Sequence, residues 1–200
     1  MSTGRPPIVD RLRDATRELH REVEDASSVA DGGLPRYVWF VEKQYGFHAP
    51  LEPRLAQASG LGALDLERRR RAHLFAADLL HFGGHPARLP RCEALPEVDT
   101  RARALGALYV LEGSTLGGVF LLHQLGRALG ITPAAGGSGI APYGAGLRDM
   151  WVSYTDALDR FVRAAPAAEA EIVDAAQETF RRMVGWMRVP APAALEPAGA

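Results

Sequence analysis

Apolar side chains recur every three or four residues along most of this chain, which is the spacing that buries one face of an α-helix. The first such segment runs from Ile8 to about Ser27. Its buried stripe is expected to consist of Val9, Leu12, Thr16, Leu19 and Val23. The sequence Asp-Gly-Gly-Leu-Pro at 31–35 then predicts a break in the helix.

The same spacing predicts six more helices. The second begins near Pro35, a residue suited to a first turn, and Pro50 and Pro53 are expected to bend it before Leu55. Thr100 is expected to cap a helix that continues to about residue 111. The remaining helices are expected at about 64–81, 120–129, 147–164 and 166–187, with irregular, glycine-rich connections at 82–98 and 131–146.

No segment alternates apolar and polar residues with the period of two that marks a strand, and no internal repeat is visible. A chain of 200 residues that is 47% apolar is large enough to bury one substantial core. The sequence therefore predicts a single all-α domain over residues 8–188. The tail at 189–200, which is mostly proline and alanine, is expected to be disordered.

Charge and apolar content exclude several classes of partner. The net charge is −1, from 23 Lys and Arg against 24 Asp and Glu, so no global positive field attracts nucleic acid. The four arginines at 68–71 follow acidic residues and are expected to form a solvated face. The N-terminus lacks the apolar core of a signal peptide, and no apolar run approaches the roughly 20 residues that cross a bilayer. We therefore expect a cytoplasmic protein with no membrane partner.

The chain has one cysteine, Cys92, so it can form neither an internal disulfide nor a thiolate metal cluster. Its surroundings, Leu-Pro-Arg-Cys-Glu at 89–93, predict a loop. We expect a surface or half-buried free thiol there, since no helix N-terminus or neighbouring histidine marks it as reactive.

His20 is the first candidate for chemistry, because it lies beside the apolar stripe of the first helix. Arg13 lies seven residues earlier, on the same face and about 10 Å along the axis. Glu24 lies one turn later and is placed to accept from the imidazole nitrogen that does not bind a metal. Thr16, one turn earlier, is small enough to let a planar ring approach. The alternative is a structural histidine with a satisfied hydrogen bond.

Three glycines interrupt an otherwise apolar helical run, Gly113, Gly117 and Gly118. Each costs a helix about 1 kcal/mol relative to alanine, so their presence needs a compensating gain. One reading is close packing between helices. The other is a bent helix whose bare backbone lies against a flat ligand. Together with His20, this segment can hold a flat metal macrocycle, with a nitrogen ligand on one face and open space on the other.

These two segments resemble a known family. The pattern Leu-x-x-Ala-Thr-x-x-x-His-x-x-x-Glu at 12–24 resembles the proximal helix of haem oxygenases. Gly-Ser-Thr-Leu-Gly-Gly at 113–118 resembles their distal-helix motif, in the form of the bacterial biliverdin-producing members. Segments 45–52 and 179–186 are also similar, so the resemblance covers about residues 8–188. It implies a helical bundle with haem sandwiched between a proximal helix and a kinked distal helix.

The resemblance also implies roles for particular residues. His20 is implied to be the axial iron ligand, with Gly113, Gly117 and Gly118 over the opposite face of haem. Phe180 is expected to line the pocket wall. Arg13 matches a position that pairs with a haem propionate, and Arg148 falls near another such position. Thr16 and Glu24 complete the set of expected haem-binding residues.

One position departs from the family pattern. Many members carry an aspartate directly after the first distal glycine, where it anchors ordered water near bound dioxygen, but this chain has Ser114. A hydroxyl both donates and accepts hydrogen bonds but cannot act as a carboxylate. The water network is therefore expected to use other groups such as His48, at a position often held by tyrosine. The alternative for His48 is ordinary helix packing.

The implied activity is oxidative cleavage of haem to biliverdin, ferrous iron and carbon monoxide, using dioxygen and electrons from a reductase or ferredoxin. A phytochrome that uses biliverdin is a further implied partner, and iron acquisition is the other implied role. Two alternatives stay open at this point. One is a haem carrier or sensor without turnover, motivated by Ser114. The other is a thiamine-degrading enzyme of similar architecture; such enzymes rely on a catalytic cysteine, and Cys92 in its proline-flanked loop is wrongly placed for that role.

Overall fold

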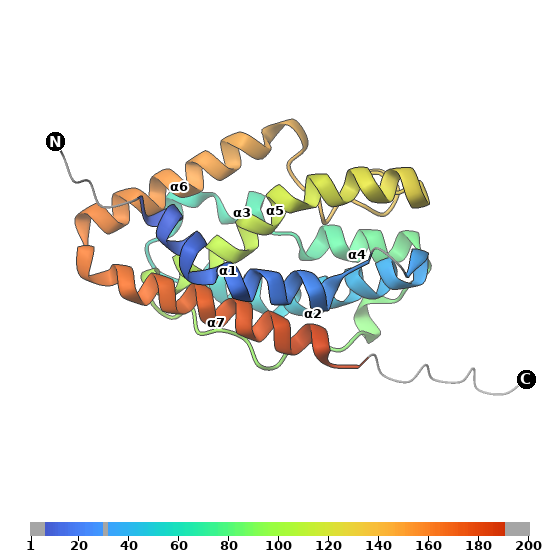
Figure 1. The fold of residues 1–200 in the computed structure, drawn as a ribbon, viewed down its shortest axis with the longest axis horizontal. Coiled ribbons are helices and arrows are strands. Elements are labelled where there is room, and N and C mark those ends of the chain that lie inside the picture. Colours follow the sequence, from blue (N-terminus) through green and yellow to red (C-terminus); the bar gives the residue numbers. More distant parts are fainter. Residues whose placement is uncertain (1–6, 30–31, 191–200) are drawn as a thin grey trace, which may run out of the picture.

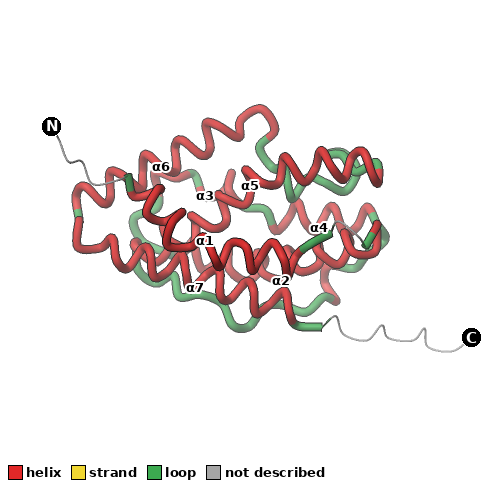
Figure 2. The backbone as a smooth tube through the Cα atoms, in the orientation of Figure 1, coloured by secondary structure: helices red, strands yellow, loops and turns green. Residues whose placement is uncertain are grey.

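The computed structural model describes residues 7–29 and 32–190, and within them the protein consists of seven α-helices, four short 3₁₀ turns and loops (Figure 2). No strand occurs in these residues, so the all-α prediction is confirmed. The predicted disordered tail falls almost entirely outside them. The helices are α1 Ile8–Ser27, α2 Gly33–Gln57, α3 Leu66–Arg69, α4 Ala72–His81, α5 Arg101–Leu129, α6 Leu147–Ala164 and α7 Glu169–Arg188.

The predicted helix at 64–81 is wrong, because the chain there divides into a 3₁₀ turn at Gly62–Leu64 and the two helices α3 and α4. Asp65 adopts the left-handed conformation with φ of 45°, and Arg70 is extended, which separates the three pieces. These breaks allow Arg69 and Arg71 to point into the protein while Arg68 and Arg70 stay exposed. The expected solvated arginine face is therefore wrong for two of its four members.

The two helices predicted around the glycine segment form one helix, α5, which begins where Thr100 accepts a hydrogen bond from the backbone N–H of Arg103. This confirms the predicted cap. The helix remains continuous through the three glycines, and its path changes direction in the middle (Figure 1). Two side-chain hydroxyls in that region bond back to helix carbonyls, Ser114 to Leu111 and Thr115 to Glu112, a feature that often bends helices.

By length and composition α5 could cross a membrane, which corrects the expectation that no apolar run approaches this size. Half of its most apolar window is buried inside the protein, as in the core helix of a folded domain. Helix α5 packs against α6 and α7, and α7 also packs along α1 (Figure 1). We therefore interpret α5 as the central helix of the bundle.

Helix α2 continues through both of its prolines. Pro50 has no N–H to donate to the carbonyl of Gly46, and that carbonyl instead accepts from the backbone N–H of Cys92 at 2.9 Å. Gly46 also lies so close to Trp186 that an added Cβ would stand 2.5 Å from its ring. The loop that holds Cys92 is thus packed tightly on α2. Cys92 itself is buried, which corrects the expected surface or half-buried thiol.

The connection at 131–146 is fixed at several points behind α5. The Tyr37 hydroxyl donates to the carbonyl of Gly136 at 2.6 Å. The buried carboxylate of Asp78 accepts from the backbone N–H groups of Ser138 and Gly139 and from the Ser138 hydroxyl. Because its backbone groups are hydrogen-bonded to Tyr37 and Asp78, this connection can support the neighbouring helix α5.

Candidate functional site

Helices α1 and α5 approach each other at Thr16 and Tyr109. Thr16 is buried, and its hydroxyl is hydrogen-bonded to the Tyr109 side chain; burial raises the pKa of Tyr109 although this bond and Arg13 oppose the rise. Beyond the place where their ribbons cross in Figure 1, α1 and α5 run in the same general direction and move apart. Along their own helices, His20 lies one turn after Thr16 and Gly113 lies one turn after Tyr109.

The imidazole of His20 is accessible and oriented by two neighbours. Its side chain is 54% exposed, and its Nδ1 lies 3.5 Å from the Glu24 carboxylate. The ring meets Phe180 edge-on, with 5.8 Å between the ring centroids. Its Nε2 makes no hydrogen bond with the described part of the chain, so this nitrogen is available to a ligand. Glu24 on Nδ1 and a free Nε2 form the arrangement in which histidine binds metals.

The face of α5 that carries Gly113 and Gly117 is open. A Cβ added to Gly113 or to Gly117 would meet no atom within 4 Å. On the same face, Phe120 is 68% exposed and Leu116 is 42% exposed. Exposed apolar side chains beside open backbone are typical of a surface that an apolar ligand covers.

Gly118 has a different role from the other two glycines. It is buried, and a Cβ there would stand 1.9 Å from the carbonyl oxygen of Ile140. Close packing thus accounts for this glycine without a ligand. Open backbone fits Gly113 and Gly117, whereas Gly118 is closely packed, although against the connection at 131–146 rather than against a second helix.

Ser114 is held by a buried arginine that sequence reasoning missed. Arg71 is 3% exposed, and its Nη1 donates to the Ser114 hydroxyl at 2.7 Å and to the carbonyl of Leu111 at 3.2 Å. Its Nε and Nη2 both donate to the carbonyl of Gly139. Burial lowers the pKa of Arg71, opposed by Tyr143, Glu112 and Glu52. The guanidinium therefore joins α5 to the connection behind it.

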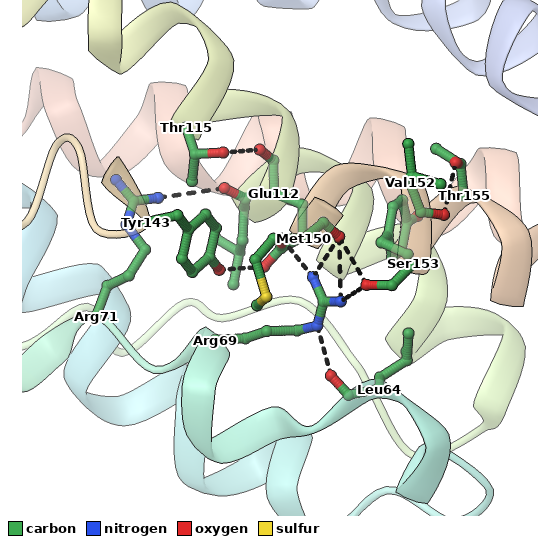
Figure 3. Close-up of polar contacts among 12 residues, drawn as sticks. Leu64, Arg69, Arg71, Glu112, Thr115, Tyr143, Met150, Val152, Ser153 and Thr155 are labelled. Carbon is green, nitrogen blue, oxygen red and sulfur yellow. Dashed lines mark hydrogen bonds and ion pairs between the residues drawn. The ribbon is translucent and has the colours of Figure 1, made fainter. Parts of the chain in front are cut away.

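A second buried arginine, Arg69, pairs with Glu112 on α5 (Figure 3). The Tyr143 hydroxyl donates to the other oxygen of that carboxylate at 2.9 Å, and Arg69 also donates to Ser153 and to the Met150 carbonyl. Burial raises the pKa of Glu112, while Arg69 and Tyr143 oppose the rise. The only sequence signal for this cluster is Glu112 itself, a carboxylate within an apolar helix.

His48 lies in the core, 1% exposed, against the ring of Phe75. Its Nδ1 is 3.0 Å from Glu52, which also accepts from the backbone N–H groups of Arg71 and Ala72. Burial lowers the pKa of His48, although the hydrogen bond to Glu52 opposes this, so the ring is neutral near pH 7. Its Nε2 is buried and has no hydrogen-bond partner among residues 7–29 and 32–190. This burial fits the packing alternative, while the expected role in a water network remains a prediction.

The two expected propionate partners lie at the surface. Arg13 pairs with Asp10 on its own helix at 3.1 Å, and its side chain is 66% exposed. Arg148 is exposed in the first turn of α6. Neither arginine is tied to the core, so both side chains are available to a ligand. In the described residues no three His, Cys, Asp or Glu side chains gather as a metal site, so His20 is a candidate single ligand rather than part of a cluster.

Comparisons with known proteins decide the family. A sequence model described as "Heme oxygenase" matches residues 7–189, which is most of the chain. The chain belongs to the haem oxygenase family. It is 34% identical over 155 residues to the haem oxygenase PigA of Pseudomonas aeruginosa, covering 74% of this chain and 76% of that protein.

The fold of this haem oxygenase family member is also that of a solved relative. The NO- and CO-bound haem oxygenase from Neisseria meningitidis superimposes with a TM-score of 0.73 over 96% of this chain and all of that one, at 23% identity. This likeness concerns the fold alone. The family is an enzymatic, haem-degrading one, which leaves the thiamine-degrading alternative without support. The buried Cys92, whose pKa is raised by that burial, is also poorly suited to act as a nucleophile.

Proposed function

We propose that this protein cleaves haem to biliverdin, ferrous iron and carbon monoxide, using dioxygen and electrons from another protein. One pair of observations supports the proposal: the imidazole of His20 on α1 is 54% exposed, and the backbone of Gly113 and Gly117 on α5 has open space where side chains would stand. An imidazole on one side and side-chain-free backbone on the other fit a flat iron porphyrin.

His20 would bind the iron through Nε2, and the Glu24 carboxylate would accept from Nδ1 and hold the ring in that tautomer. Phe180, in edge-on contact with the imidazole, would limit rotation of the ring. When bound, haem supplies the iron that reduces dioxygen and the ring carbon that is oxidised. The chain's own contribution is therefore to position the ring and to manage water and protons around it.

The face of α5 would exclude water from the ring. Leu116 and Phe120, which are 42% and 68% exposed, would be covered by the porphyrin, and each would contribute part of the about 1.5–3 kcal/mol that full burial of such a side chain gives. Arg13 and Arg148 would meet the two propionates at the rim, where their exposed side chains can turn toward a carboxylate. Ser114 and, through ordered water, His48 would hold protons near the open face.

The proposal includes partners. The electrons would come from a reductase or ferredoxin in the cytoplasm, and the biliverdin would supply a phytochrome, or the iron would enter metabolism. The acidic and basic residues of this chain nearly balance, which favours a donor bound by a local surface rather than by the overall charge.

The test is His20→Ala, with His73→Ala as the matched control because His73 is also exposed but belongs to another helix, α4. We expect His20→Ala to lose both the absorption spectrum of histidine-ligated haem and all turnover. Added imidazole should restore part of each. The control should match the wild type. Full turnover by the variant without imidazole would contradict the proposed ligand.

A second candidate function rests on Ser114, which replaces the carboxylate that many family members carry. On this reading the protein binds haem without degrading it, as a carrier or sensor. Haem-loaded protein given a reductant and dioxygen separates the two functions. An enzyme converts the Soret band to a biliverdin spectrum, whereas a carrier retains the Soret band.

A further inference from the structure

One face of α2 contacts the C-terminal ends of both α1 and α7. Arg36, Trp39 and Lys43 follow one another at spacings of three and four residues on α2, so they share this face. The guanidinium carbon of Arg36 lies 3.6 Å from the centre of the Trp39 ring, and Nζ of Lys43 lies 6.0 Å from the same ring. The first contact is close, and the second is at the limit of cation–π attraction. Two cations therefore share one indole ring.

Arg36 holds the end of α1. Its Nε donates to the carbonyl of Ser28 at 2.8 Å, and its Nη2 donates to the carbonyl of Ala26 at 3.1 Å. The last carbonyls of a helix lack partners within the helix and carry partial negative charge, so a cation is favourable there. The approach requires a glycine at position 32, because a Cβ on Gly32 would stand 2.2 Å from Cβ of Arg36. Helix α1 thus ends on a side chain of α2.

Lys43, the only lysine of the chain, holds the end of α7 in the same way. Its Nζ donates to the carbonyls of Trp186 at 3.1 Å and Val189 at 2.6 Å, and lies 4.2 Å from the centre of the Trp186 ring. The indole N–H of Trp186 donates back to the carbonyl of Lys43 at 2.7 Å. Lys43 is 5% exposed, and burial lowers its pKa although Cys92 and Glu42 oppose this. Two carbonyls and one ring face replace the water that this ammonium loses.

The two helix ends that α2 holds belong to the helix of the candidate haem ligand and to its neighbour. Helices α1 and α7 pack along each other and run in the same direction (Figure 1). His20 lies six positions before Ala26, and Phe180 lies six positions before Trp186, so each ring is about 9 Å along its helix from a held carbonyl. The rings of His20 and Phe180 meet edge-on, with 5.8 Å between their centroids. The angle of the imidazole therefore depends on how α1 lies against α7.

We propose that three residues of α2 form a clasp that sets the position of α1 against α7 and thereby fixes the orientation of the His20 imidazole against Phe180. The clasp consists of Arg36, Trp39 and Lys43, which are positioning residues because they act through the ends of the two helices. The inference rests on the proposed role of His20 in haem binding. An imidazole held at one angle gives the iron one bond geometry, whereas a loosened imidazole samples several.

Hydrogen exchange of the haem-free protein tests the clasp itself. In Arg36→Met, amides in the last turn of α1 should exchange about two- to tenfold faster, the effect of losing a hydrogen bond of ordinary strength. Amides in the last turn of α7 should also exchange faster, because the shared ring of Trp39 is no longer held by Arg36. Lys43→Met should give the converse pattern, and Trp39→Leu, at the half-buried shared position, should loosen both ends even if Lys43→Met does not fold. Faster exchange only in the helix whose cap was removed would overturn the inference.

The iron–histidine stretching band in the resonance Raman spectrum of the ferrous haem complex reports on His20. Each folded variant of the clasp should shift or broaden this band. A role confined to the stability of the two helix ends would leave the band unchanged at temperatures where the variant is folded. An unchanged band in all folded variants, with haem bound, would therefore overturn the inference.

Arg91→Met is the matched control. Arg91 has the same chemistry, since its guanidinium carbon lies 4.2 Å from the centre of the Tyr45 ring on α2 and its Nη1 donates to the carbonyl of Leu89. It holds a loop, however, and not the end of α1 or α7. Arg188→Gln is a second control, because it removes the exposed pair that joins α7 directly to Glu22 on α1. Both controls should keep the wild-type exchange at the two helix ends and the wild-type band.

The two measurements also separate this inference from the proposed function. If the wild type binds no haem while the coupled exchange is present, the proposed function fails and the clasp stands. If haem binds through His20 but exchange at the two helix ends is not coupled, the clasp fails and the proposed function stands.

Discussion

The two faces of α5 are built in opposite ways. The front face, which carries Gly113 and Gly117, is bare, with nothing within 4 Å of the positions that their Cβ atoms would occupy. The remaining sides of the same turns, which we call the rear face, are crowded. There Gly118 meets the Ile140 carbonyl, and Glu112 is paired with the buried Arg69. One helix thus carries an open surface and packed contacts within seven residues.

This difference indicates a role for the contacts of Glu112 and Gly118, which we call the anchor. Three glycines weaken a helix by about 1 kcal/mol each, and a bare face contributes no contacts to offset that loss. The polar bonds and close packing on the rear face hold α5 in place instead. Substitutions that alter one face at a time test whether the two faces have these separate roles.

The largest effect is expected from Glu112→Gln on the rear face. The substitution leaves Arg69 as a buried charge without its counterion, which typically costs 3–5 kcal/mol. Chemical denaturation, monitored by circular dichroism, should show a loss of unfolding free energy of this size. The paired variant Arg69→Met with Glu112→Leu should recover most of it, because it removes both charges together.

Glu18→Gln supplies the control for that prediction. Glu18 pairs with Arg21 at 2.9 Å on the solvent side of α1, where both side chains are more than 60% exposed. An exposed pair of this kind contributes about 0.5 kcal/mol or less. Equal losses in Glu112→Gln and Glu18→Gln would mean that the rear face is not an anchor.

A smaller loss is expected from Gly118→Ala. The new Cβ would stand 1.9 Å from a backbone oxygen, which cannot move aside like a flexible side chain. Overpacking of this type typically costs about 1–3 kcal/mol, so the melting temperature should fall. Since the contact is with the connection at 131–146, hydrogen exchange should also increase there. An unchanged melting temperature would show that Ile140 can withdraw freely.

The residues of the front face and the helices that hold them could be predicted from the sequence. The buried contacts of the rear face could not. Periodicity gave α1 and α6 with the observed bounds, and the motif spacing gave His20, Gly113 and Gly117. The helix predictions succeed because helices are encoded by residues close together in the chain, whereas the roles of His20, Gly113 and Gly117 stay predictions. The accessible His20 and the open glycines are local features of this kind.

The rear face depends on pairs that are distant in sequence. Arg69 and Glu112 are 43 positions apart, as are Arg71 and Ser114. A run of four arginines gave no sign that its second and fourth members turn inward, because the irregular backbone at Asp65 and Arg70 decides this. Similarly, only the three-dimensional structure separates Gly118, which packs on Ile140, from Gly117 beside it.

Gly113→Ala on the front face is expected to have the smallest effect on stability, and to raise stability rather than lower it. An alanine there meets no atom within 4 Å, so the haem-free protein should gain up to about 1 kcal/mol from helix propensity. The same methyl group would project into the space proposed for haem, so haem affinity should fall. Gly185→Ala is the matched control, since Gly185 is also unobstructed but lies on another helix, α7. It should give the same gain in stability with unchanged haem affinity, both measured by titration and thermal melting. If Gly113→Ala also leaves haem affinity unchanged, the bare face of α5 is not where haem binds, and the contrast between the two faces loses its functional meaning.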